Sequence, residues 1–286
     1  MANAIEIQGL CKRYDGFELD HLDIVLPEGS IMGFVGENGA GKSTTIKALL
    51  GLIKADSGRI SLLGRPADGA DKELKKQIGV VFEESYFHDG LTLQNVSGIM
   101  GRVYDNWDDD LFKSYAKRFR LPKDKRMKEY SRGMKMKAAI AAALAHHPRL
   151  LILDEATSGL DPMVRSQILD IFLEFIQEEN HSVFLSSHIT SDLEKICDYI
   201  TFIHGGKVML SAAKDELTDR FAVAKCSEAQ LAALERAEVV AVRRNLFGCE
   251  LLVRDRAAFA AAHPDILLDQ TTIVEIMMFF VEGEKR

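Results

Sequence analysis

The sequence predicts an α/β fold with a mostly parallel sheet, an antiparallel β subdomain, a helical subdomain and a small C-terminal α+β appendage. Three observations support this fold class. Short apolar runs alternate with helical segments, which is typical of a parallel sheet covered by helices. Two segments near the N-terminus alternate apolar and polar residues, as paired half-buried strands do. After about Phe221 the pattern changes to a short mixture of strands and helices.

The composition is typical of a globular chain with a sizeable core. The chain has 286 residues, of which 47% are apolar and 28% are charged, and this excludes a disordered or collagen-like chain. The net charge of −7 disfavours binding to nucleic-acid phosphates, so we expect no nucleic-acid partner. The apolar runs are too short to span a bilayer. The four scattered cysteines are expected to be reduced thiols.

The expected elements of the main domain follow in order along the chain. Residues 5–10 and 17–26 are predicted as paired strands, and residues 30–36 as a strand that runs into a glycine-rich turn. Helical periodicity follows over residues 43–52. Further strands are predicted at residues 60–64, 78–82, 150–155, 182–188 and 199–206, and residues 92–147 are predicted to be mostly helical.

The C-terminal segment is predicted to be a small domain of its own. It reads as strand, helix, hairpin, helix and final helix, with the hairpin turn at NLFG (Asn245–Gly248). We therefore expect a main domain over residues 1–220, with its helical subdomain at about 92–147, and an α+β domain over residues 221–286.

The glycine-rich turn carries the first chemical motif. GENGAGKST fits G-x-x-x-x-G-K-[ST] and lies between a predicted strand and a predicted helix. In such a loop, backbone N–H groups cradle phosphate oxygens and the helix N-terminus adds its dipole. The lysine reaches the β- and γ-phosphates, and the serine supplies an oxygen to Mg²⁺. The candidate nucleotide-binding residues are Gly36, Glu37, Asn38, Gly39, Ala40, Gly41, Lys42, Ser43 and Thr44.

Two carboxylates end the predicted strand LLILDE. Asp154 is the candidate ligand of Mg²⁺, together with Ser43, and Glu155 is the candidate base that polarises the attacking water. An apolar run before Asp-Glu is a weak signal alone, because a solvated strand end has the same pattern. Its place after a phosphate loop makes the signal specific.

In the order of its motifs, the chain resembles the ATP-binding subunits of ABC transporters. The phosphate loop is followed by YSRGMKMK (Tyr130–Lys137), by HPRLLILDEATSGLDP (His147–Pro162) and by FLSSH (Phe184–His188). YSRGM resembles the family's signature, usually LSGGQ; SGLD resembles its D-loop; and His188 resembles its switch histidine. The resemblance covers about Ile5–Lys214 and implies a P-loop NTPase core that hydrolyses ATP with Mg²⁺.

The resemblance further implies that each ATP is shared between two subunits. Ser131 and Gly133 would cap the γ-phosphate across the dimer, where the free N–H groups of a helix start suit an anion. Asp161 would organise the interface, His188 would contact the γ-phosphate, and Tyr14 matches the aromatic that stacks on adenine. Plainer interpretations remain: a helix N-cap for Ser131, a turn residue for Asp161, a strand-end histidine for His188 and a turn aromatic for Tyr14.

Some residues depart from the family pattern. The family has a glutamine after the strand IGVVF, where it senses Mg²⁺ and water, and this chain has Glu83. A carboxylate can still bind Mg²⁺, so Glu83 is a candidate metal ligand and catalytic residue, or it points to solvent. The signature has Tyr130 for leucine, Arg132 for glycine and Met134 for glutamine. Arg132 either adds positive charge to the site across the dimer or is a tolerated surface residue.

A segment from Glu83 to Val96 would meet the transmembrane partner. Its Tyr86, Phe87 and His88 offer aromatic area suited to a partner helix. The alternative is local packing under a loop.

Together these observations indicate the ATP-binding and hydrolysing subunit of a bacterial ABC transporter. The C-terminal segment resembles those of ABC-2-type exporter ATPases for bacitracin, lantibiotics and peptide toxins, so the expected cargo is a peptide or antimicrobial compound. We expect a homodimer, or a heterodimer with a second ATP-binding subunit. It would drive separate transmembrane permease subunits at the cytoplasmic face of the membrane. The alternatives are a soluble ABC ATPase in assembly or repair and a non-enzymatic ATP-binding switch.

Overall fold

The computed structural model describes residues 2–83, 87–246 and 248–284. The chain divides into two compact units, Met1–Val208 and Met209–Arg286. This division falls twelve residues before the boundary expected from the sequence, because β10 (Lys207–Ala213) and α8 (Lys214–Arg220) lie wholly or mostly in the second unit.

The first unit contains an antiparallel sheet with the order β2-β1-β4-β5. β1 (Asn3–Tyr14) and β2 (Phe17–Pro27) form the hairpin expected from their alternating pattern. β4 (Ser57–Leu62) pairs with the other edge of β1, and β5 (Arg65–Pro66) follows it. Their buried side chains pack on one face into the main core.

A second sheet has the order β10-β9-β3-β8-β7-β6, and all of its strands except most of β10 belong to the first unit. Neighbouring strands from β9 to β6 are parallel, which confirms the α/β class. All residues of β3, β7 and β8 are buried, as their unbroken apolar runs predict for strands covered on both faces. The bounds are β3 Ile31–Val35, β6 Ile78–Val81, β7 Leu150–Asp154, β8 Ser182–Ser187 and β9 Tyr199–His204.

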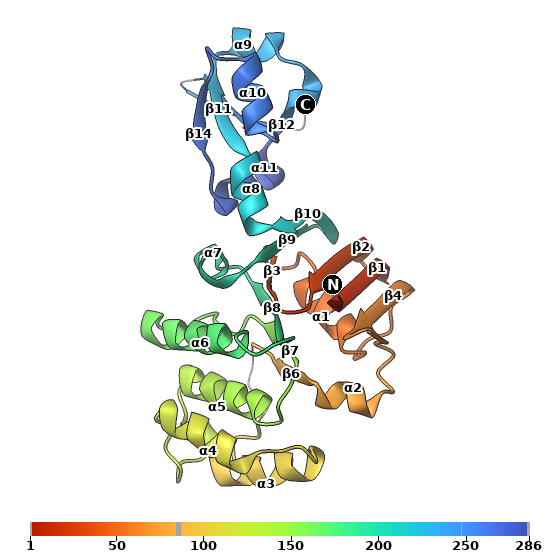
Figure 1. Ribbon diagram of the computed structural model, residues 1–286, viewed down its shortest axis with the longest axis vertical. Coiled ribbons are helices and arrows are strands. Elements are labelled where there is room, and N and C mark those ends of the chain that lie inside the picture. The colour runs from red at the N-terminus through yellow and green to blue at the C-terminus, as the bar shows by residue number, and fades with distance from the viewer. Residues whose placement is uncertain (1, 84–86, 247, 285–286) are drawn as a thin grey trace. The chain divides into compact units, whose positions relative to one another are not determined.

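Helices surround this sheet and form a helical subdomain (Figure 1). α3, α4 and α5 contact one another; the 3₁₀ helix η1 precedes α5, and α6 and α7 follow β7 and β8. The bounds are α1 Lys42–Leu49, α2 Lys72–Lys76, α3 Leu93–Val103, α4 Asp109–Arg118, η1 Met127–Glu129, α5 Arg132–Leu144, α6 Pro162–Phe175 and α7 Thr190–Ile196.

The second unit is an α+β domain with its own core. Its antiparallel sheet has the order β12-β13-β11-β14, and in the final helix Ile273, Ile276 and Phe279 are buried. Besides α8, the bounds are β11 Ala222–Cys226, α9 Glu228–Ala233, η2 Arg236–Glu238, β12 Val239–Asn245, β13 Gly248–Val253, α10 Arg256–Ala262, β14 Leu267–Gln270 and α11 Ile273–Glu282.

Several short elements were absent from the expected order. They are α2, β5, β10, α8 and β14, and each has at most seven residues. All four cysteines lie among the described residues, and none is in a disulfide. Among the described residues, no helix is long and apolar enough to cross a membrane.

Candidate functional site

The phosphate loop joins β3 to α1 at the carboxyl edge of the parallel sheet. Gly41 has a φ of 115°, a conformation that side chains other than glycine rarely adopt. A Cβ on Gly36 would lie 2.5 Å from the carbonyl oxygen of Ile203, so only glycine fits this close approach. α1 begins directly after the loop, at Lys42. The loop residues Glu37, Asn38, Gly39 and Ser43 are exposed, which leaves this helix start open to a ligand.

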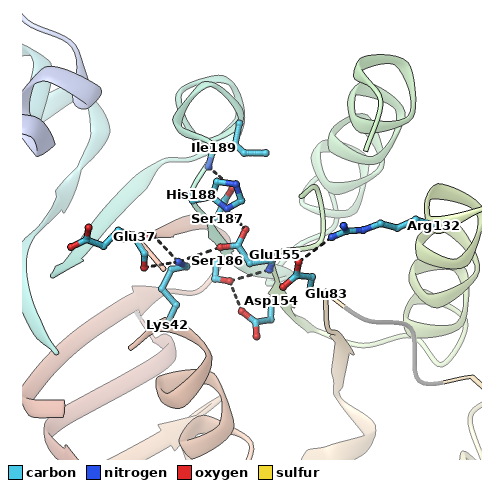
Figure 2. A network of polar contacts seen from close by, with 11 residues as sticks. Glu37, Lys42, Glu83, Arg132, Asp154, Glu155, Ser186, Ser187, His188 and Ile189 are labelled. Atoms are coloured by element: carbon cyan, nitrogen blue, oxygen red, sulfur yellow. Dashed lines mark hydrogen bonds and ion pairs between the residues drawn. The ribbon is translucent and has the colours of Figure 1, made fainter. Parts of the chain in front are cut away.

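Lys42 is a buried cation at the centre of the site. Its Nζ donates to the carbonyl oxygens of Gly36, at 2.7 Å, and Glu37, at 3.2 Å. It also forms an ion pair with Glu155, with 3.2 Å between Nζ and Oε1, and both side chains are less than 10% exposed. Lys42 and Glu155, from distant segments, therefore meet as the motif spacing predicts (Figure 2).

The strand end after β7 is held by Ser186 on the neighbouring β8. Ser186 Oγ donates to Asp154 Oδ1 at 2.6 Å and accepts from the backbone N–H of Glu155 at 3.1 Å. Both carboxylates are buried. Sequence reasoning missed Ser186, although its place in FLSSH, at the end of an apolar strand, could have indicated it.

The two oxygens of the Glu155 carboxylate have different partners. Its Oε2 lies 2.8 Å from Nδ1 of His188, whose ring is about half exposed. Its Oε1 is buried and has no hydrogen-bond partner, because the approach of the Lys42 ammonium is close enough for an ion pair but misses hydrogen-bond geometry. Figure 2 shows the carboxylate between the lysine and the histidine.

Glu83 contacts Arg132. Arg132 Nη2 donates to Glu83 Oε1 at 3.0 Å, and each side chain is about half exposed. β6 and β7 are parallel neighbours, with Val81 paired with Leu153, and Glu83 and Glu155 each follow that pair by two residues in their own segments. The structure therefore brings Glu83 to the same sheet edge as the two carboxylates.

The two helix starts expected at the partner-facing side are exposed. Ser131 is the N-cap of α5, where Oγ accepts from the N–H of Met134 at 3.3 Å. Asp161 is the N-cap of α6, where Oδ1 accepts from the N–H of Val164 at 3.0 Å. Gly133 lies in the first turn of α5 and is partly exposed. The plain interpretation of Ser131 as a helix cap thus holds beside any role across a dimer.

The signature helix α5 is anchored by buried polar groups. Tyr130 Oη donates to the carbonyl oxygen of Pro122 at 2.6 Å, and burial raises the pKa of this phenol. Lys137 Nζ donates to Gln167 Oε1 on α6 at 2.7 Å, and desolvation lowers the pKa of this ammonium group. The first contact holds the residue before the N-cap of α5 against the segment at Pro122, and the second joins the interior of α5 to α6.

Tyr14 stands apart from this network. It ends β1, is 45% exposed, and has the Lys12 ammonium 5.5 Å from its ring centre. An exposed aromatic ring is available to stack on a base. Ser85 and Tyr86 of the expected partner-binding segment lie outside the described residues, and His88 is exposed.

The residues present fit a magnesium nucleotide. The loop offers backbone N–H groups and one ammonium for phosphates, and the glycine cradle leaves no room for a Cβ at Gly36. The hydroxyl of Ser43 and the carboxylates of Asp154 and Glu83 are hard oxygen donors, which suit Mg²⁺. Glu155 Oε1, which is buried without a hydrogen bond, lies 3.2 Å from the ammonium of Lys42.

Comparisons with known proteins find a matching family model, similar proteins and similar solved structures. A family model described as ABC transporter matches residues 19–158. The chain is 37% identical to the bacitracin transport ATP-binding protein BcrA of Bacillus licheniformis over 77% of this chain and 73% of that protein. It is 34% identical to the lantibiotic transport ATP-binding protein SrtF of Streptococcus pyogenes over 74% and 91% of the two chains. Among solved structures, cbiO1 from Clostridium perfringens, part of the ABC transporter complex cbiONQ, matches with a TM-score of 0.64 at 30% identity, over 74% of this chain and 89% of that one.

Proposed function

The chain belongs to the ATP-binding subunits of ABC transporters, which hydrolyse ATP to power transport, and from this premise we propose that Lys42, Glu155 and His188 form its hydrolytic site. The observation that carries the proposal is the buried Glu155 carboxylate, which contacts His188 through one oxygen and forms an ion pair with Lys42 through the other. The relatives are transport proteins, which favours a transporter subunit over the soluble ATPase of assembly or repair.

Each residue of the network has a chemical role in this proposal. Lys42 turns from Glu155 toward the β- and γ-phosphates when ATP enters the loop, because phosphate carries more charge than the carbonyls that hold it now. Glu155 then accepts a proton from the water that attacks the γ-phosphorus, and the bond to the ADP oxygen breaks. His188 fixes the second oxygen of Glu155 and donates toward the γ-phosphate.

We propose that Ser43, Asp154 and Glu83 hold Mg²⁺ beside the nucleotide. When bound, the ion would neutralise charge on the β- and γ-phosphates. Ser186 orients Asp154 for this task through the 2.6 Å hydrogen bond. Glu37, Asn38, Gly39, Ala40, Gly41 and Thr44 surround the phosphates with Gly36, and Tyr14 stacks on adenine.

The proposed working form is a dimer, of two copies or of this chain with a related subunit. The starts of α5 and α6 support it, because Ser131 and Asp161 are exposed and Gly133 is partly exposed at the positive ends of these helices. Asp161 lies beside them at the start of α6. We propose that these residues complete the nucleotide site of the other subunit.

We propose that a helix of a transmembrane partner docks beside Glu83, which would place the chain at the cytoplasmic face of the membrane. A groove of about 290 Å³ lies there, lined mainly by apolar side chains that include Leu52, Leu74, Val80, Phe82 and Tyr104. Leu52 is 62% exposed. An apolar groove that leads along β6 to Glu83 suits the apolar face of a partner helix, and it would transmit partner movement to the metal site.

The proposed cargo is a peptide or antimicrobial compound that is exported. The support is the identity with the bacitracin and lantibiotic transport proteins, which extends over about three quarters of this chain. Coexpression with a membrane partner, followed by ATPase stimulation with candidate peptides, tests this choice of cargo.

The hydrolytic site is tested with Glu155→Gln. The amide keeps the size of the side chain but cannot accept a proton, so phosphate release should fall by roughly 10²- to 10⁴-fold. ATP binding, measured by calorimetry on the same protein, should be retained. Phosphate release at the parent rate would show that Glu155 is not the base, and loss of ATP binding would show that the substitution damages the site.

A further inference from the structure

Two departures from the family's motifs contact each other in this chain. Glu83 stands where the family has a neutral glutamine, and Arg132 stands where the signature has a glycine. The two are 49 residues apart in the sequence, and their side chains form an ion pair at 3.0 Å. The exchange of a neutral pair for an oppositely charged pair leaves the total charge unchanged.

The course of the Arg132 side chain is shaped by the loop after β7. A Cβ on Gly159 would lie 2.6 Å from Arg132 Nη1, so the guanidinium crosses directly over the glycine. Gly159 has a φ of 65°, which favours glycine. Arg132 therefore passes close to Gly159 of its own chain and reaches Glu83, and Figure 2 shows the contact between Arg132 and Glu83.

Glu83 adds negative charge to a region that already contains two carboxylates, so a nearby cation lowers the repulsion there. Glu83 follows the end of β6 by two residues, and Asp154 and Glu155 lie at the end of the neighbouring parallel strand β7, where Val81 pairs with Leu153. Three carboxylates thus gather where a nucleotide with several negative charges would bind. Lys42 forms an ion pair with Glu155, and Arg132 forms one with Glu83.

Resting on the function proposed above, we infer that Arg132 is a positioning residue that neutralises and aims Glu83, so that a carboxylate can stand at the metal site. Without Mg²⁺, the guanidinium offsets the repulsion between Glu83 and the phosphates. When Mg²⁺ is present, the ion takes over this neutralisation and Arg132 matters less. Ser131 and Gly133 flank Arg132, so the same contact joins the metal site of one nucleotide to the residues proposed to cap the other.

The test measures binding of a non-hydrolysable ATP analogue to the purified chain by calorimetry, in EDTA and in excess Mg²⁺. Arg132→Gln should raise the dissociation constant about fivefold in EDTA, as expected for one unpaired charge at several ångströms in a screened site, and less than twofold in Mg²⁺. Arg132→Lys should stay near the parent, because it keeps the charge. The double variant Glu83→Gln/Arg132→Gln should return to within about twofold of the parent in EDTA.

A matched control is available in the same two segments. Lys135 on α5 pairs with Asp89 at 2.9 Å, so Lys135→Gln breaks a second ion pair between α5 and the segment after β6 without touching Glu83. It should leave both dissociation constants unchanged. Both pairs are largely exposed, so every variant should melt within a few degrees of the parent.

Two results would overturn the inference. One is an Arg132→Gln variant that binds the analogue as the parent does in EDTA. The other is a double variant as weak as Arg132→Gln alone, which would mean that Arg132 acts on the nucleotide or the fold rather than through Glu83. A parent chain that binds no analogue in either buffer would overturn the proposed function and this inference with it.

Discussion

At the scale of single residues, Glu155 carries three unfavourable features at once. It is buried, its backbone has a φ of 52°, and one carboxylate oxygen has no hydrogen bond. A left-handed backbone at a residue other than glycine costs about 1–3 kcal/mol, and a buried unsatisfied acceptor costs about the same. Such costs persist when the surrounding structure enforces them, and here Ser186, Lys42 and His188 do so.

Asp161 permits a clean separation of structure from function. Its side chain caps α6 through the N–H of Val164, and loss of such a cap costs about 1 kcal/mol. Asp161→Ala should therefore lower the melting temperature by about 2–4 °C. Asp161→Asn should keep the parent's melting temperature, because asparagine caps equally well.

Differential scanning calorimetry on both variants checks this prediction. If alanine and asparagine lower the melting temperature equally, the carboxylate charge matters rather than the cap. With the cap preserved, any loss of phosphate release in Asp161→Asn would come from the proposed role at the dimer interface.

At the scale of elements, α5 and β6 are joined by a buried histidine. His146, at the end of α5, lies 3.2 Å from the carbonyl oxygen of Ile78 through Nε2 and stacks on Tyr104. Its ring is 1% exposed, and desolvation holds its pKa below the ordinary value. The folded chain therefore favours the neutral ring.

This shift predicts an acid-sensitive contact. Above the unfolded pKa of about 6.5, both the folded and the unfolded chain carry the neutral ring, and the stability of the folded chain is at its full value. As the pH falls through that value, the unfolded chain gains a proton that the folded chain does not, so the free energy of unfolding decreases. The drop in melting temperature between pH 7.5 and pH 5.5 should be larger for the parent than for His146→Gln. Equal drops for the parent and His146→Gln would show that His146 does not titrate on unfolding.

The elements that the sequence predicted best are those with a strong pattern. β3, β7 and β8 are unbroken apolar runs beside chemical motifs, and they were expected within one or two residues of their observed bounds. Elements of two to seven residues, such as α2 and β14, have too few positions for a period to stand out. β14 is recognisable only through its pairing with β11.

Some contacts of the candidate site could also be predicted from the sequence, and others could not. Motif spacing placed Lys42, Asp154 and Glu155 together, because the carboxyl ends of parallel strands meet at one sheet edge. It could not show that Glu83 contacts Arg132, since that contact depends on how α5 packs beside the loops. Nor could it show the hydrogen bonds of Ser186, which depend on the register of β7 with β8.

At the scale of the whole molecule, we propose that one chain carries two different half-sites. The phosphate loop and Glu155 form one, and the exposed starts of α5 and α6 form the other. If ATP is shared between subunits, neither half works alone. Without a facing helix start, the γ-phosphate would lose the N–H groups expected to stabilise its charge.

The proposal that each nucleotide site is shared between two subunits is tested most directly by mixing two inactive variants. Lys42→Ala removes the ammonium at the phosphate loop, and Ser131→Arg blocks the exposed start of α5; each variant alone should release almost no phosphate. In a mixed dimer both lesions fall on one nucleotide site and the other site is intact. Differently tagged chains verify that mixed dimers form, and phosphate release is then measured on the mixture. If the sites are shared, phosphate release should partly return on mixing. A verified mixed dimer with no activity, or a monomer that hydrolyses ATP at the full rate at high dilution, would contradict this proposal.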